Sequence, residues 1–201
     1  MKKLALLILI VLLSNCTSKK QVQVGDTDWQ RQMNADFKDA TKSPLTDKDR
    51  ASFTGLYFFK YDSTYAVKAK LNRTPDAKKF KMKTTSDRRV DYVKYGVVLF
   101  VLNGKQYQLN LYQDLDLMRK EGFEDYLFLP FLDDTNGETT YGGGRYIECS
   151  IPEKDTLIID FNKAYNPYCA YNGKYSCPIV PNENYLKTNI EAGVKAFNKH
   201  H

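Results

Sequence analysis

The segment Val97–Leu111 is the strongest constraint on the fold of this sequence, because it combines strand-like alternation with a specific turn. Apolar residues fill 97–102 and recur at every second position of 107–111. Between these runs lies Asn103-Gly104, a pair that suits the positive φ angles of a two-residue hairpin turn. The sequence therefore predicts an antiparallel β-hairpin, and with it a sheet whose neighbouring strands are joined by short turns.

Similar strand-like patterns recur along the chain after Gly55. They cover 56–59, 65–71, 80–84, 126–131, 146–151, 157–161 and 186–190. Pro130 either ends its strand or places it at a sheet edge, and we expect 146–151 to pair with 157–161. This count of roughly eight short strands predicts a mainly β fold, either a single antiparallel β-sandwich or a partly open barrel.

Two short helices are expected on the N-terminal side of this sheet. Apolar residues recur every fourth position from Trp29 to Phe37, after Asp28, a residue type that caps helices. Thr46 and Asp49 resemble a capping box for a second short helix. We expect the aromatic side chains to dock both helices on the sheet.

The N-terminus resembles an export signal. Met1–Lys3 is basic and Leu4–Leu13 is an apolar run of 10 residues, too short to cross a bilayer as a helix but typical of a secretory signal. Leu13-Ser14-Asn15-Cys16 resembles the bacterial lipoprotein cleavage box, in which Cys16 would be lipidated. The alternative is an ordinary exported protein with an incidental cysteine.

The remaining organisation follows from this signal. Residues 17–27 are polar and are expected to tether one β-rich domain, 28–199, to the membrane. No aspartate follows Cys16 directly, which in lipoproteins resembling this one is compatible with outer-membrane sorting. The expected location is therefore the bacterial cell envelope, with the protein anchored by lipid to the outer membrane and facing the periplasm.

The positive charge does not indicate a nucleic-acid partner. The formal net charge is +6, and four lysines of the signal and tether supply most of it: Lys2, Lys3, Lys19 and Lys20. A nucleic-acid-binding domain clusters its basic residues on the folded part. We therefore expect no nucleic-acid partner.

The segment Asp160–Asn184 concentrates turn-forming residues. Asn166-Pro167 and Asn172-Gly173 both favour turns, and Pro178 and Pro181 keep the chain extended. This composition predicts a rigid, ordered loop. Such a loop serves either as a binding site or as a lid over the core.

Four short sequence motifs in this region resemble those of a known family. The chain contains, in this order, TYGGGRYIE (140–148), DFNKAYNPYCAY (160–171), SCPIVPNEN (176–184) and EAGVK (191–195). This series of motifs resembles the bacterial family catalogued as domain of unknown function 1684. The match is dense over 133–195 and extends more weakly back to residue 43. The resemblance implies a bacterial protein and brings no catalytic roles with it.

The cysteines leave several states open. In an exported protein Cys169 and Cys177 would form a disulfide, remain two buried thiols, or bind a metal. Metal is the weakest of these alternatives, because the only histidines are His200 and His201. The same lack of an internal histidine disfavours a nucleophilic triad. Cys149 is expected to be a buried apolar group, and no metal or cofactor is predicted.

A small-ligand site is predicted beside the proline-rich loop. Arg145 follows three glycines, and its guanidinium would grip a carboxylate or phosphate, while Asn162, Tyr165, Asn166 and Tyr171 would supply amides and flat apolar faces suited to a small polar or carbohydrate-like ligand. The structural alternative is a buried pair between this arginine and an aspartate or glutamate.

Two further functional hypotheses stay open. Glu148, Asp160 and Glu183 are candidate acid and base groups for an envelope hydrolase, and Asp134 is also available. The other hypothesis is a non-catalytic module whose loop only stabilises the fold. The leading hypothesis remains a lipid-anchored envelope protein that binds a small polar ligand.

Overall fold

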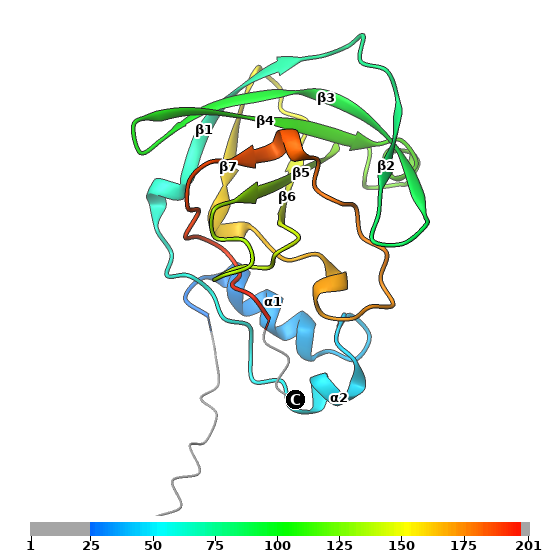
Figure 1. The fold of residues 1–201 in the computed structure, drawn as a ribbon, viewed down its shortest axis with the longest axis vertical. Helices are drawn as coiled ribbons and strands as arrows, with labels where there is room; N and C mark the ends of the chain where they lie inside the picture. The colour runs from blue at the N-terminus through cyan, green and yellow to red at the C-terminus, as the bar shows by residue number, and fades with distance from the viewer. Residues whose placement is uncertain (1–24, 198–201) are drawn as a thin grey trace, which may run out of the picture.

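The computed structural model describes residues 25–197 (Figure 1). The predicted signal, Cys16 and most of the tether lie outside these described residues, so they stay predictions. Within 25–197, no helix combines the length and the apolar character needed to cross a membrane.

Residues 25–197 form two helices followed by eight strands. The helices are α1 (Asp28–Lys38) and α2 (Asp47–Ala51). The strands are β1 (Ala66–Arg73), β2 (Phe80–Lys83), β3 (Arg89–Leu102), β4 (Lys105–Asp114), β5 (Tyr126–Asp133), β6 (Arg145–Ser150), β7 (Thr156–Asp160) and β8 (Tyr185–Leu186). Five 3-10 turns connect them: η1 (Ser63–Tyr65), η2 (Leu117–Arg119), η3 (Phe161–Lys163), η4 (Tyr168–Ala170) and η5 (Asn182–Asn184).

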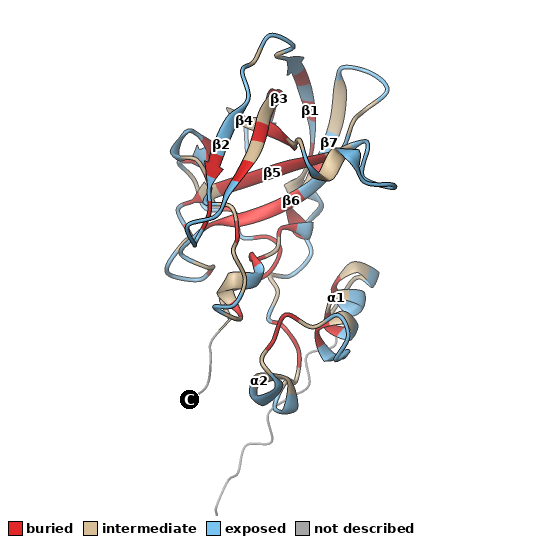
Figure 2. Ribbon diagram, turned by 90° about the vertical axis from the view of Figure 1, so that its right-hand side faces the viewer, coloured by how far each residue is buried: buried red, intermediate tan, exposed pale blue. Residues whose placement is uncertain are grey.

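All eight strands belong to one curled sheet. The main order is β6-β5-β4-β3-β1-β7, with β2 added to β3 and β8 to β5. Every pairing is antiparallel except that of β5 with β8. The sheet curves into a half-barrel with the helices at one end (Figures 1 and 2). Of the two predicted architectures, the partly open barrel is confirmed.

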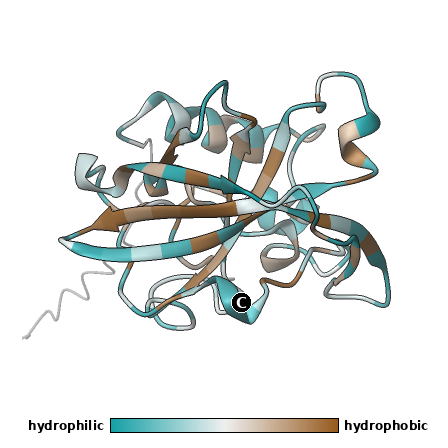
Figure 3. Ribbon diagram, turned by 90° about the horizontal axis from the view of Figure 1, so that it is seen from above, coloured by the Kyte–Doolittle hydropathy of each residue, from teal (hydrophilic) through white to brown (hydrophobic). Residues whose placement is uncertain are grey.

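The predicted hairpin is the β3–β4 pair. Asn103 and Gly104 have φ angles of 50° and 75°, and Leu102 pairs with Lys105 around them. Figure 3 shows this long pair from above, with β3 largely hydrophobic. The local signal was sufficient here because a two-residue turn fixes the register of both strands.

A β-bulge divides β3 into two halves that face different cores. Lys94 pairs with Tyr112, but Gly96 pairs with Leu111, so the register shifts by one residue. A Cβ on Gly96 would lie 2.6 Å from the Asn72 carbonyl oxygen, and this close approach requires glycine. The shift reverses which side chains face inward.

The half-barrel consequently has two cores and a third cluster under the helices. The inner core holds β-strand residues such as Val98, Leu111 and Phe131, together with Phe161 and Ile190 from the later segments. An outer cluster covers the other face of the sheet: Met82, Val90, Tyr92, Tyr112, Phe128, Tyr146 and Val180. The third cluster joins the helices to the C-terminal segment: Phe37, Leu45, Leu56, Tyr171 and Val194.

The predicted pairing of 146–151 with 157–161 is wrong. β6 pairs with β5, and β7 pairs with β1 at the opposite edge of the sheet. The connection between β6 and β7 crosses the open side of the half-barrel, and Asp155 in it accepts a hydrogen bond from the Leu71 amide at 2.7 Å. Alternation shows that a segment is a strand, but it does not identify the strand's partner.

β4 and β5 separate after one paired position, Tyr112 with Phe128. Asn184 fills the gap: its amide nitrogen donates to the Asn110 and Pro130 carbonyls at 2.8 and 2.7 Å, and its oxygen accepts from the Asn110 amide at 2.9 Å. Pro130 lies inside β5 and neither ends it nor lies at an edge. Because N and O of one strand residue point to the same side, its missing N–H faces this gap.

The N-terminal helices form largely as expected. Thr27, rather than Asp28, caps α1, and its capping box uses Gln30. Thr46 caps α2 by accepting from the Asp49 amide at 3.2 Å. Two predicted strands are shorter than expected: 56–59 reduces to one bridge between Phe58 and Val194, and 186–190 reduces to β8.

Candidate functional site

A cleft of about 550 Å³ lies between α1 and the β6 side of the sheet, and it is the candidate functional site. Its lining mixes aromatic, amide and charged side chains: Trp29, Gln32, Met33, Asp36, Phe37, Lys42, Glu148, Tyr165 and Tyr168. This volume lies within the range of small-ligand sites, roughly 300–1,000 Å³.

The α1 wall of the cleft is fixed by the apolar stripe of the helix. Trp29 contacts the Phe58 ring edge to face, with centroids 6.1 Å apart, and Phe37 contacts the Tyr171 ring at 4.8 Å. These contacts hold the helix against Tyr171 and against Phe58, which itself forms a bridge with Val194. The cleft therefore has a rigid aromatic side, because both ends of the stripe are packed.

The opposite wall comes from Tyr165, which pairs with β6. The amides and carbonyls of Tyr146 and Tyr165 exchange two hydrogen bonds, at 2.9 and 3.0 Å. The Tyr165 hydroxyl donates to Glu148 Oε1 at 2.9 Å. Burial, with the nearby Tyr126 and Glu148, raises the pKa of Tyr165 well above its ordinary value, so its hydroxyl remains a donor at neutral pH.

A charged rim completes the cleft. Asp36 accepts from Lys42 Nζ at 2.9 Å and from Gln32 Nε2 at 3.0 Å. The hydrogen bond to Asp36 raises the pKa of Lys42, which keeps the lysine cationic. The cleft thus presents two carboxylates, Asp36 and Glu148, and one cation beside its aromatic walls.

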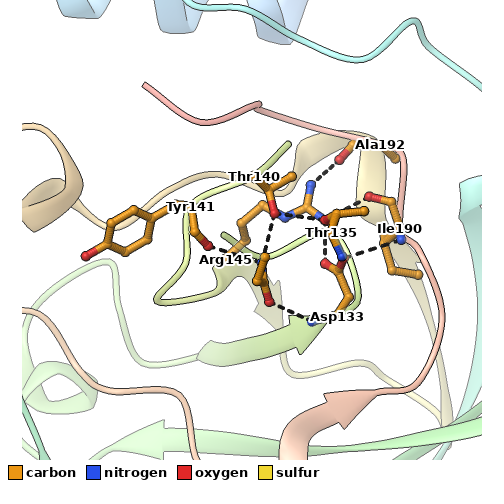
Figure 4. Close-up of polar contacts among 8 residues, drawn as sticks. Asp133, Thr135, Thr140, Tyr141, Arg145, Ile190 and Ala192 are labelled. Carbon is orange, nitrogen blue, oxygen red and sulfur yellow. Dashed lines mark hydrogen bonds and ion pairs between the residues drawn. The ribbon is translucent and has the colours of Figure 1, made fainter. Parts of the chain in front are cut away.

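Arg145 does not line this cleft; it lies beside Asp133, Ile190 and Ala192 (Figure 4) and against the Phe131 ring of the inner core. Its side chain is fully buried, and it forms an ion pair with Asp133 at 2.6 Å. It also donates to the carbonyls of Ile190, at 2.8 Å, and of Ala192. Burial lowers the pKa of Arg145, and Asp133 opposes this effect. This is the buried pair that was the structural alternative to a ligand-binding arginine.

Three other predicted ligand-binding residues are also buried, with partners inside the protein. Asn162 accepts from the Asp62 amide at 3.0 Å and donates to the Asp62 carbonyl at 2.8 Å. Asn166 donates to the Tyr171 hydroxyl at 3.2 Å. Of the five predicted residues, Tyr165 is the one that lines the cleft.

The predicted acid and base groups lie in different environments. Glu148 lines the cleft, whereas Glu183 lines a separate hollow of about 360 Å³ beside Tyr112. Asp160 caps η3 by accepting from the Asn162 amide at 3.1 Å. The fourth carboxylate, Asp134, accepts from the Tyr185 hydroxyl. The structure instead brings Asp36 to the cleft with Glu148.

Cys169 and Cys177 are free and adjacent. The Cys169 amide donates to Cys177 Sγ at 3.1 Å. A hydrogen bond from the Cys177 thiol, with further bonds from Thr85 and Tyr141, lowers the pKa of Cys169 to about 6, despite opposing burial. The same thiol bond raises the pKa of Cys177.

Cys149 differs from this pair. Burial raises the pKa of Cys149 to about 12, and the side chain packs against the inner core. Among residues 25–197, no group of three or more His, Cys, Asp or Glu side chains is placed to hold a metal. A disulfide between Cys169 and Cys177 stays a prediction.

Sequence reasoning missed most of the cleft. The sequence predicts only a docking role for Trp29, and no local pattern marks Gln32, Asp36 or Lys42 as site residues. The spacing of Gln32 and Asp36 places them on one face of α1, beside the apolar stripe. That signal marks a polar helix edge, but it gives no indication that β6 and η4 lie opposite.

Most of the chain resembles a solved structure, and residues 51–195 match a family model. The model described as protein of unknown function (DUF1684) matches residues 51–195. An uncharacterized protein of Haloarcula marismortui, solved by NMR in solution, is 32% identical, with a TM-score of 0.65, and the match covers 85% of this chain and 92% of that one. No curated protein matches this chain. The chain belongs to the DUF1684 family.

Proposed function

We propose that this protein is a lipid-anchored envelope protein that binds a small polar, carbohydrate-like ligand in the cleft between α1 and β6. The observation that carries the proposal is the lining of the cleft, where Trp29, Tyr165 and Tyr168 stand beside two carboxylates and a lysine. The apolar face of a sugar ring packs on aromatic rings, and its hydroxyls donate to carboxylates. The cleft supplies both kinds of contact.

The ligand proposal can be tested with the chain's own fluorescence. Trp29 is the only tryptophan in the sequence and lines the cleft, so its emission reports binding there directly. The purified full-length protein in detergent is titrated with cellobiose, chitobiose and maltose. At least one of these sugars is expected to shift the emission saturably.

Substitutions at the cleft separate specific binding from a general solvent effect. Glu148→Gln and Tyr168→Ala should each weaken the titration about tenfold or more, since each removes one direct contact. The control Glu153→Gln changes an exposed carboxylate in the turn after β6 and should bind as the parent does. A titration that the cleft substitutions leave unchanged, or no response to any sugar, would reject the ligand class.

The lipid anchor rests on the N-terminal sequence, which resembles a lipoprotein signal ending at Cys16. Growing the expressing bacterium with an alkyne fatty acid should label the wild-type protein and place it in the membrane fraction. Cys16→Ser should abolish both the label and membrane retention, whereas Cys149→Ser should retain both. An unlabelled wild-type protein would reject the anchor and leave the ligand proposal standing.

A second candidate function, hydrolysis by paired carboxylates, is favoured by the presence of both Asp36 and Glu148 in the cleft. Paired carboxyl groups are the usual machinery of glycoside hydrolysis. Release of reducing ends from the same disaccharides would support this reading, provided that Asp36→Asn and Glu148→Gln abolish it. Saturable binding without any product by the wild-type protein would exclude it for these sugars.

A further inference from the structure

Cys169 lies beside a group of hydrogen-bonding side chains that do not line the cleft. We name it the Cys169 site: Cys169, Cys177, Thr85 and Tyr141. The two cysteines are in contact, because the Cys169 amide donates to Cys177 Sγ at 3.1 Å, and the Cys177 amide donates to Thr85 Oγ1 at 3.1 Å. The Cys177 thiol and the Thr85 and Tyr141 hydroxyls lower the pKa of Cys169, because donors near a sulfur stabilise the thiolate over the thiol.

Each donor is fixed by its own segment of the chain. Thr85 follows β2, where its amide donates to the Cys177 carbonyl at 2.9 Å and its hydroxyl accepts from the Cys177 amide at 3.1 Å. Tyr141 precedes the glycine run, and its ring points away from the Arg145 cluster (Figure 4). A Cβ on Gly143 would lie 2.5 Å from this ring. The glycine run therefore makes room for Tyr141 rather than for an anion.

The two thiols are unequal in exposure. Cys169 is half-buried, whereas Cys177 is 7% exposed. Tyr168, which precedes Cys169, is itself exposed. A partner molecule therefore reaches Cys169 first, and Cys177 is positioned behind it. This division resembles that between an attacking and a resolving thiol.

We propose that Cys169 and Cys177 are a redox-active pair that reduces disulfide bonds, with Cys169 as the nucleophile and Cys177 as the resolving thiol. The Cys169 thiolate attacks one sulfur of a substrate disulfide, whose S–S bond breaks and whose second sulfur leaves as a thiolate that takes a proton. Cys177 then loses its proton and attacks Cys169. This step releases the second substrate thiol and leaves an internal Cys169–Cys177 disulfide. Two electrons pass from the protein to the substrate.

The first test measures the rate of Cys169 alkylation by iodoacetamide against pH, on the reduced full-length protein in detergent, with peptide-resolved mass spectrometry. With a pKa near 6, the rate should level off above pH 7, whereas an ordinary thiol of pKa about 8.5 continues to gain rate up to pH 9. At pH 7, Cys169 should react on the order of 100-fold faster than Cys149 or more, after allowance for the lower nucleophilicity of a low-pKa thiolate.

Two substitutions test whether the donors position Cys169. Tyr141→Phe and Thr85→Val should each move the alkylation midpoint upward while the protein keeps its near-ultraviolet circular dichroism. Tyr107→Phe serves as the control, since it removes a tyrosine hydroxyl that lies outside the site, and it should leave the midpoint unchanged. A wild-type midpoint above pH 8, or a midpoint that neither donor substitution moves, would overturn the proposal.

The second test follows the exchange itself with glutathione disulfide as the probe. The wild-type protein should form the internal disulfide and release two glutathione molecules per chain. Cys177→Ser should stop at a mixed disulfide on Cys169, and Cys169→Ser should form at least tenfold less adduct on Cys177. Equal trapping at either cysteine, or a wild-type pair that stays reduced, would contradict the assigned roles. Because the probe contains no sugar, this result is independent of ligand binding in the cleft.

Discussion

Arg145 fastens the C-terminal segment to the sheet through a buried charge. Asp133 is its only charged partner among the ion pairs of residues 25–197, and the carbonyls of Ile190 and Ala192 accept further hydrogen bonds from it. A buried guanidinium without its carboxylate is strongly unfavourable, because the remaining charge stays out of water. The arginine thus ties residues 190–192 to β5 and β6.

Asp133→Asn should therefore lower the free energy of unfolding by about 3–5 kcal/mol, measured by urea denaturation at pH 7. Asp116→Asn is the matched control, since it removes a carboxylate that pairs with Arg119 on the surface, and exposed pairs contribute little. Similar urea midpoints for the two variants would show that the buried pair does not hold the segment.

Asn166 and Tyr165 are adjacent in sequence but differ in role. Asn166 is buried, and its amide bonds to the Tyr171 hydroxyl and to the Lys195 carbonyl, the latter at 3.0 Å. Asn166→Ala should lower the free energy of unfolding by about 1–3 kcal/mol, because these partners lose a buried donor. Tyr165→Phe should cost under about 1 kcal/mol, since Glu148 is exposed and water replaces the lost hydroxyl. Thermal denaturation of both variants checks the order, and equal losses would contradict it.

At the scale of elements, Asn184 substitutes for missing strand pairing between β4 and β5. Asn184→Ala would remove the hydrogen-bond partner of the Asn110 amide and of the Asn110 and Pro130 carbonyls, in the gap between β4 and β5. We expect hydrogen exchange of the Asn110 amide to accelerate about tenfold or more, equivalent to about 1.4 kcal/mol or more of lost protection. Asn182→Ala, at an exposed position two residues earlier, should leave that amide unchanged. Equal protection in both variants would show that other contacts hold β4 and β5 together at this gap.

The elements that sequence predicts well are those set by neighbouring residues. The β3–β4 hairpin follows from Asn103-Gly104, and α2 from Thr46 as its cap. The partner of β6 and the location of Asp133 beside Arg145 depend on how the sheet curls, and no local pattern encodes that. The cleft depends on the same information, because it joins α1 to Glu148 and Tyr165, more than a hundred residues away.

At the scale of the whole molecule, buried tyrosines of the outer and third clusters make the fold sensitive to alkali. Burial is the largest cause that raises the pKa of Tyr92, Tyr112, Tyr126, Tyr146 and Tyr171 above the ordinary value of 10.0. A raised folded-state pKa contributes stability that is fully present below the unfolded-state value, and that stability is lost as pH rises toward the folded-state value. Below pH 10 both states keep these protons, so these groups cause no change of stability with pH there.

The free energy of unfolding should therefore fall steeply above about pH 10, since the unfolded chain releases phenolic protons that the folded chain retains. Urea midpoints at pH 8, 10 and 11, with tyrosinate absorbance at 295 nm, check this. The five buried tyrosines should ionise together with unfolding. Tyr92→Phe, which removes one such proton, should reduce the loss between pH 10 and 11. A smooth titration of all tyrosines before unfolding would mean that the aromatic clusters admit water.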